Sequence, residues 1–274
     1  MIDAMGMMVL PGWVLPLVPA DSAATPPQEW LAHAGVTCAG WADAEPRQPS
    51  CCDVVPMELI ETDDQIACAP RTIHERGRTA FVLPARRGAP LLDAAAQALA
   101  RLRATLIICV DGDEDAAVEA ANRAATHGGR VAVGPLREAA ALRRARSAGA
   151  LTATDPAWLV DDPHLWRLVV DGTVRLLMST SGHPPGVDAL YRSGPARGLA
   201  GPEALAALLG AWPAALLGCG TKGLLAPGRE ADVCLLEPSG GSAVIVETLL
   251  RGADARSPHG RTIRAEPVDG LPAR

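Results

Sequence analysis

TLIICVDGDEDAAVEAANRAATHGGRVAV, residues 105–133, holds one complete strand–helix–strand unit. Residues 105–110 form a nearly continuous apolar run, which is typical of a parallel strand buried on both faces. Residues 114–127 have helical spacing, and the glycine pair Gly128-Gly129 follows them where a helix C-cap belongs. A second apolar run comes next. The stretch therefore predicts a β-α-β unit within a parallel sheet.

The same alternation continues on both sides of this unit. The sequence predicts eight strands, at Trp13–Val18, Val36–Trp41, Val54–Leu59, Thr79–Pro84, Thr105–Val110, Arg130–Val133, Ala150–Ala153 and Val174–Ser179. It predicts helices over Leu91–Arg103, Glu114–His127, Arg137–Ala148, Pro163–Val170 and about Pro202–Leu217. Eight strand–helix repeats indicate an α/β fold of the (β/α)8 TIM-barrel type, and strand counting leaves a doubly wound sheet open as the alternative.

The chain is expected to divide into three parts. Residues 1–12 form a lead-in strand of a β domain, residues 13–218 form a loop-shortened barrel, and residues 219–274 form a small C-terminal β domain. The last part changes character, because short strands separated by Gly/Pro turns replace the strand–helix alternation. These strands are predicted at Ala231–Glu237, Ala243–Leu249 and Thr262–Pro267.

Composition excludes several classes of partner. The formal net charge of −6 and the absence of clustered Lys and Arg argue against nucleic acid. The apolar stretch Met5–Ala20 has no basic residue before it and is broken by prolines, and Ala204–Leu217 is too short to span a bilayer. The seven cysteines form no C-x-x-C pair, so we expect reduced thiols in a cytoplasmic protein that does not contact membranes.

Several motifs resemble the amidohydrolase superfamily, and the dihydroorotases within it. IDAMGMMVLPG, residues 2–12, is similar to the family's lead-in to the first barrel strand. KGLLAPGREAD, residues 222–232, resembles the return of the chain into the β domain, and SPHGRT, residues 257–262, resembles the dihydroorotase ending. The resemblance implies a barrel that hydrolyses cyclic amides with one or two zinc ions, which activate water.

The chain departs from the family at the positions where the resemblance implies metal ligands. These are a His-x-His on the first strand, a histidine on the fifth, a histidine on the sixth and an aspartate on the eighth. The residues found there are Leu17, Pro19, Gly112, Pro135 and Gly182. None of them offers a side-chain lone pair to zinc. The sequence therefore predicts no metal, no cofactor and no catalytic residue, with His183 as a vestigial substrate contact.

An acidic cluster follows the fifth predicted strand, at Asp111, Asp113, Glu114 and Asp115. Such a cluster could hold a hard cation. A helix N-terminus also favours acidic residues, because its backbone N–H groups and dipole attract negative charge. We interpret the cluster as the cap of the helix that begins at Glu114.

These observations favour a non-catalytic dihydroorotase homologue. It would serve as a scaffold or partner subunit in pyrimidine biosynthesis, with aspartate transcarbamoylase as the partner that the resemblance implies, or as a homo-oligomer. The alternative is an active cyclic-amide hydrolase of the dihydroorotase or hydantoinase type, with an altered or metal-free site that uses His183 and the acids of residues 111–115. A truncated reading frame is the third interpretation.

Overall fold

The computed structural model describes residues 4–18, 28–42, 52–110, 112–179 and 185–254. Its largest element is an eight-stranded parallel sheet in which the strands follow one another in chain order. The strands are β2 (Trp13–Val18), β3 (Val36–Ala42), β4 (Asp53–Leu59), β5 (Ala80–Pro84), β6 (Thr105–Cys109), β7 (Arg130–Gly134), β8 (Leu151–Thr154) and β9 (Leu176–Leu177). The edge strands β2 and β9 contact each other, so the sheet is nearly closed into a barrel.

This strand order confirms the predicted TIM-type fold and excludes the doubly wound alternative, in which the order reverses partway through the sheet. All eight predicted strands are present, and most of their ends agree within one residue. The exception is β9, which is shorter than the predicted Val174–Ser179. One set of inward side chains, including Val14, Val55, Ile107 and Leu176, fills the barrel with an apolar core.

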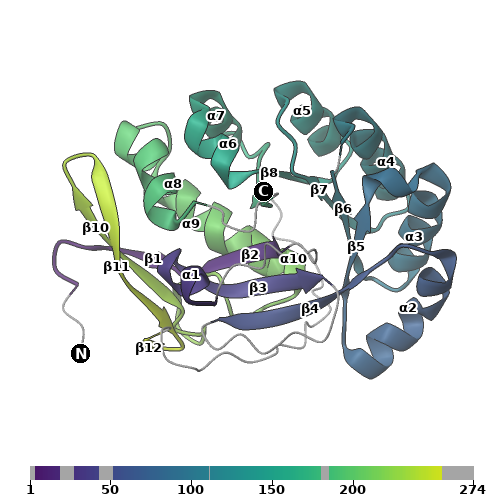
Figure 1. Ribbon diagram of the computed structural model, residues 1–274, viewed down its shortest axis with the longest axis horizontal. Helices are drawn as coiled ribbons and strands as arrows, with labels where there is room; N and C mark the ends of the chain where they lie inside the picture. Colours follow the sequence, from purple (N-terminus) through teal and green to yellow (C-terminus); the bar gives the residue numbers. More distant parts are fainter. Residues whose placement is uncertain (1–3, 19–27, 43–51, 111, 180–184, 255–274) are drawn as a thin grey trace.

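Helices cover the outside of the barrel (Figure 1). They are α1 (Gln28–His33), α2 (Asp63–Arg76), α3 (Ala89–Arg101), α4 (Glu114–Thr126), α5 (Ala139–Ser147), α6 (Pro156–Asp161), α7 (Pro163–Val170) and α8 (Val187–Ser193). Short 3-10 turns occur at Ala85–Arg87 and Pro195–Arg197. The predicted helices correspond to α3, α4, α5 and α7. None of the described helices is long and apolar enough to cross a membrane.

Helix α2 was not expected from the sequence, because Pro70 interrupts its pattern. Its ends are nonetheless well specified. Thr62 and Gln65 form a capping box at the start, and Gly77 ends the helix in the left-handed conformation, with φ of 65°. These caps, together with the buried residues Ile66 and Ala69, outweigh the proline.

The predicted helix Pro202–Leu217 consists of three segments, α9 (Pro202–Ala206), a π-helical turn (Ala207–Ala211) and α10 (Trp212–Leu217). Helix α10 lies at the end of the barrel where the strands begin. There Leu216 and Leu217 join the interior core, and the Thr105 hydroxyl donates to the Leu216 carbonyl at 3.3 Å. This helix therefore seals the N-terminal end of the barrel.

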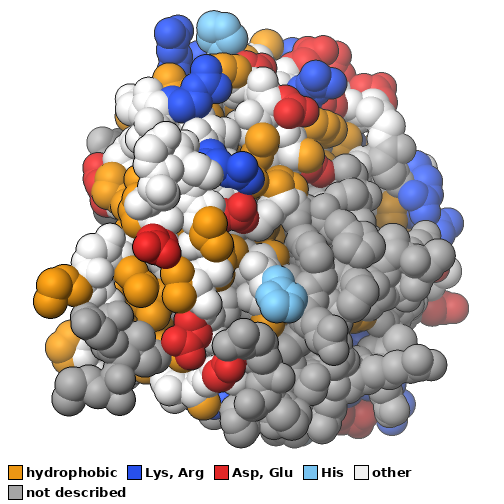
Figure 2. Space-filling model, turned by 60° about the vertical axis from the view of Figure 1, so that its left-hand side comes forward, with side chains coloured by type: hydrophobic (Ala, Val, Ile, Leu, Met, Phe, Trp, Pro, Cys, Tyr) orange, Lys and Arg blue, Asp and Glu red, His pale blue; other side chains and the backbone are white. Residues whose placement is uncertain are grey.

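A four-stranded antiparallel sheet lies beside the barrel, at the left in Figure 1. Its strands, in spatial order, are β1 (Met8–Pro11), β10 (Val233–Ser239), β11 (Ser242–Leu250) and β12 (Ala253–Asp254). Strands β10 and β11 confirm two of the predicted C-terminal strands, and the third, Thr262–Pro267, lies outside the described residues. Hydrophobic and acidic side chains are interspersed on the face that Figure 2 shows.

Candidate functional site

The C-terminal ends of the strands are where parallel barrels carry their functional groups. In this chain five side chains of that layer are apolar or carry a thiol and belong to, or pack against, the interior core. Leu17 on β2, Ala42 on β3 and Met178 after β9 are buried in the interior core, and Leu59 and Cys109 pack against it. These five positions therefore offer no histidine and no carboxylate to the barrel interior.

The structure places three of the predicted ligand positions. Leu17 lies near the end of β2 with 6% of its surface exposed. Pro135 is buried directly after β7, and Gly112 lies between β6 and α4. Pro19, Gly182 and His183 lie outside the described residues. The side chains of Leu17 and Pro135 consist of carbon and hydrogen, so neither can bind a metal.

Acidic residues at the start of α4 bind backbone groups. One carboxylate oxygen of Asp113 accepts hydrogen bonds from the N–H groups of Asp115 at 2.9 Å and Ala116 at 3.2 Å, which confirms the predicted helix cap. Both carboxylate oxygens of Glu114 accept from the loop before α5, where the N–H groups of Arg137 and Glu138 lie 2.8 and 3.1 Å away. Asp111 lies outside the described residues.

Histidines do not gather at the strand ends within the described chain. His33, His74, His127 and His164 are all exposed on the outer helices or at their ends. No group of three or more His, Cys, Asp or Glu residues in the described ranges is arranged to hold a metal ion. His183 and His259 fall in ranges that are not described.

Polar groups that the sequence did not single out lie after β8 and β9. Asp155 is buried directly after β8, and its carboxylate accepts a hydrogen bond from Ala157 N at 2.8 Å, which caps α6. The Thr154 hydroxyl is buried without a described hydrogen-bond partner. Ser179 is buried two residues beyond β9. A catalytic site without a metal at this end of the barrel would have to use these three side chains and Cys109.

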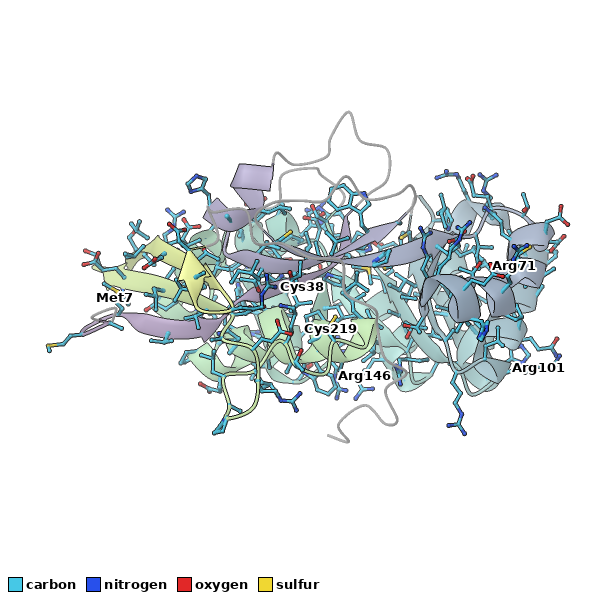
Figure 3. The ribbon with its side chains drawn as sticks, turned by 90° about the horizontal axis from the view of Figure 1, so that it is seen from below. Met7, Cys38, Arg71, Arg101, Arg146 and Cys219 are labelled. Carbon is cyan, nitrogen blue, oxygen red and sulfur yellow. The ribbon has the colours of Figure 1, made fainter. Side chains whose placement is uncertain are left out.

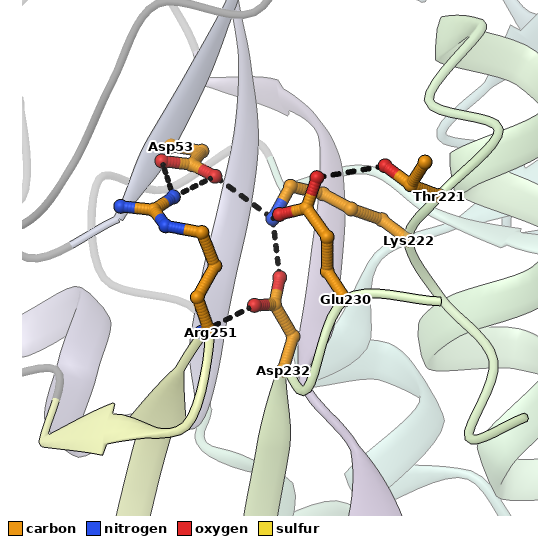
Figure 4. Close-up of polar contacts among 6 residues, drawn as sticks. All are labelled: Asp53, Thr221, Lys222, Glu230, Asp232 and Arg251. Atoms are coloured by element: carbon orange, nitrogen blue, oxygen red, sulfur yellow. Dashed lines mark hydrogen bonds and ion pairs between the residues drawn. The ribbon is translucent and has the colours of Figure 1, made fainter. Parts of the chain in front are cut away.

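The opposite, N-terminal end of the barrel contains a buried ionic cluster (Figure 4). Lys222 lies at its centre, with its ammonium 2.8 Å from Asp53 and 3.1 Å from Glu230, and it also pairs with Asp232. Arg251 completes the cluster, because one guanidinium nitrogen lies 2.7 Å from both oxygens of Asp53. Asp53 begins β4, whereas Asp232 precedes β10 and Arg251 follows β11. The cluster therefore joins the barrel to the small sheet.

The charges of the cluster stabilise one another in the interior. Burial by itself would lower the pKa of Lys222, but the charges and hydrogen bonds of the neighbouring Asp232 and Asp53 carboxylates help to raise that pKa above its ordinary value. The nearby thiols Cys38 and Cys219 lie side by side in the interior (Figure 3). A hydrogen bond with Cys219 and burial raise the pKa of Cys38 well above its usual range, so the thiol is neutral at ordinary pH. Buried and mutually paired charges of this kind are typical of residues that hold a structure together.

Comparison with solved structures gives extensive matches at low sequence identity. The dihydropyrimidinase of Brevibacillus agri matches with a TM-score of 0.81 and 15% identity, over 98% of this chain and 91% of that one. The D-hydantoinase of Bacillus sp. AR9 matches with a TM-score of 0.78 and 16% identity, over 98% and 91%.

A more distant match is the zinc-bound N-acyl-D-glutamate deacylase of Bordetella bronchiseptica, with a TM-score of 0.69 and 15% identity over 96% of this chain and 90% of that one. No protein-family model and no curated protein sequence matches the chain. At these identities the likeness shows a shared fold, a barrel with an attached β sheet.

Proposed function

We propose that this chain is a dihydroorotase-like amidohydrolase homologue that does not hydrolyse cyclic amides and acts as a scaffold or partner subunit. The proposal rests on Leu17, Gly112 and Pro135, which stand where the family resemblance implies metal ligands and which lie at or just beyond the ends of three strands. Hydrolysis of an amide at neutral pH needs an activated water and a polarised carbonyl, which this fold would obtain from a metal. A barrel without those ligands keeps its shape and loses that chemistry.

The outer face of the small sheet supports an assembly role. Val9 on β1 and Val244 and Val246 on β11 are 46%, 62% and 42% exposed. Along β11, Val244 and Val246 alternate with Ala243 and Ile245, which pack toward the core, so these two valines lie on the opposite face of the strand. Exposed apolar side chains that are grouped on one sheet face are typical of a protein-binding surface.

Aspartate transcarbamoylase is the partner that the dihydroorotase resemblance implies. We expect a mixture of the two proteins from the same organism to sediment as one species, heavier than either component. The double substitution Val244→Lys with Val246→Lys should abolish this species, because it places two charges in the apolar interface. Val170→Lys, at an exposed valine of α7 outside the sheet, is the matched control and should leave it intact.

Sedimentation velocity distinguishes the outcomes. A heavy species that this chain forms alone, and that the double substitution dissociates, would favour the homo-oligomer and count against the transcarbamoylase. Two components that sediment independently at micromolar concentration, with this chain monomeric, would contradict the scaffold proposal.

The second candidate is an active cyclic-amide hydrolase with an altered or metal-free site. Its support is the similarity of the fold to two solved structures, one named a dihydropyrimidinase and the other a D-hydantoinase. Cys109, Asp155 and Ser179 lie at described strand ends and would have to supply the chemistry. Turnover of dihydrouracil or hydantoin that is lost in a Cys109→Ala or Asp155→Asn variant would support this candidate.

A further inference from the structure

A cavity of about 490 Å³ opens beside the N-terminal end of the barrel, away from the strand ends discussed above. Arg146 in the last turn of α5, Arg175 just before β9 and Trp212 at the start of α10 line it. Helices and strands run in opposite directions in this fold, so these three positions meet at the same end. Figure 3 shows Arg146 toward the lower edge of the molecule in that view.

Two arginines line this cavity, and no carboxylate in the described part of the chain pairs with either of them. Arg175 stacks on the ring of Trp212, with 3.9 Å between the guanidinium carbon and the ring centroid, and its Nε donates to the Gly172 carbonyl at 3.2 Å. Within the described residues, neither Arg175 nor Arg146 lies within 4.0 Å of an acidic side chain. Burial, and then the positive charge of Arg146, lower the pKa of Arg175.

The remaining lining sets the charge and the polarity of the cavity. Asp171 is the acidic lining residue, and its carboxylate accepts a hydrogen bond from Thr173 N at 2.8 Å. The other lining side chains are mainly aliphatic, and they include Val169, Val174 and Leu208. The cavity thus combines two guanidinium groups, one carboxylate and an apolar wall, with a net charge of +1.

We propose that this cavity binds a small organic oxyanion, in which a phosphate or carboxylate group is joined to an apolar body. Guanidinium groups bind planar or tetrahedral oxyanions through paired, charge-assisted hydrogen bonds. Stacking on Trp212 holds the Arg175 side chain in place before a ligand arrives, which reduces the entropy lost on binding. The volume lies within the range of small-molecule sites. The site is independent of any activity at the strand C-terminal ends.

Calorimetric titration of the whole chain with phenyl phosphate, inorganic phosphate and phenol tests this proposal. We expect saturable binding of phenyl phosphate. Inorganic phosphate and phenol should each bind at least about tenfold more weakly, because inorganic phosphate lacks the apolar body and phenol lacks the oxyanion group. Arg146→Gln and Arg175→Gln should each weaken phenyl phosphate binding by about tenfold or more. Arg101→Gln, at an exposed arginine of α3, is the matched control and should change nothing.

Arg175→Lys keeps the positive charge, so its binding should fall between that of the wild type and that of Arg175→Gln. Circular dichroism of every variant separates a lost site from a lost fold. Equal affinity for phenyl phosphate in the wild type, Arg146→Gln and Arg175→Gln would overturn the proposal. So would equal affinity for phenol, or the absence of saturable binding to the wild type.

Discussion

Lys222→Met should destabilise the protein by about 3–5 kcal/mol, the range found when one member of a buried ion pair is removed. The ammonium of Lys222 is fully buried among Asp53, Glu230 and Asp232. A methionine fills a similar volume but leaves the buried carboxylates of Asp53 and Asp232 and the partly buried carboxylate of Glu230 with Arg251 as the cation of the cluster. Urea denaturation at pH 7, followed by circular dichroism, measures the change in the free energy of unfolding.

Arg71→Ala is the matched control for the loss of a positive charge. Arg71 pairs with Glu75 on the surface of α2, where solvent screens the interaction, so its removal should leave stability nearly unchanged. A loss of less than about 1 kcal/mol for Lys222→Met would contradict the central structural role that we assign to the cluster.

Gly223→Ala should destabilise the protein by about 2–4 kcal/mol, for two separate reasons. Gly223 has a φ of +76°, which disfavours any residue with a Cβ atom. The added Cβ would also lie 2.3 Å from the carbonyl oxygen of Gly210 in the π-helical turn and 2.8 Å from Ala214 Cβ. Backbone cannot move aside easily, so the loop that carries Lys222 must shift. The same denaturation experiment measures the effect.

Gly228→Ala separates the two reasons. Gly228 has nearly the same φ, +80°, but nothing lies within 4 Å of the position of its added Cβ. Gly228→Ala should therefore lower the free energy of unfolding only by the cost of the positive φ, about 1–2 kcal/mol. If both substitutions destabilised the protein equally, the close approach between Gly223 and Gly210 would have no energetic weight.

The barrel could be predicted from the sequence because its strands are buried on both faces. Runs such as Thr105–Cys109 and Arg130–Gly134 are apolar after their first residue, and glycines follow the helix between them. Helix α2 was missed because Pro70 in its interior argues against a helix. The residues that define its ends are the caps at Thr62 and Gly77. The length of strand β9 was overestimated, because an apolar run of sequence does not show where hydrogen bonding to the neighbouring strand ends.

Much less of the candidate sites could be predicted. Lys222 was recognised as part of a family-like motif, but its partner Asp53 comes from a distant part of the chain, and no local pattern connects the two. The same is true of Arg146, Arg175 and Trp212, which only the barrel closure brings together. The cap at Asp113 was predictable, because its partners lie two and three residues ahead in the sequence.

The most direct test of the proposed function is the zinc content of the purified protein after incubation with excess zinc and desalting. The same preparation is assayed for hydrolysis of dihydroorotate, dihydrouracil and hydantoin. We expect far less than one zinc ion per chain and no turnover above the uncatalysed rate, because Leu17, Gly112 and Pro135 provide no ligand. One or two zinc ions per chain, with turnover that a chelator abolishes and zinc restores, would contradict the account.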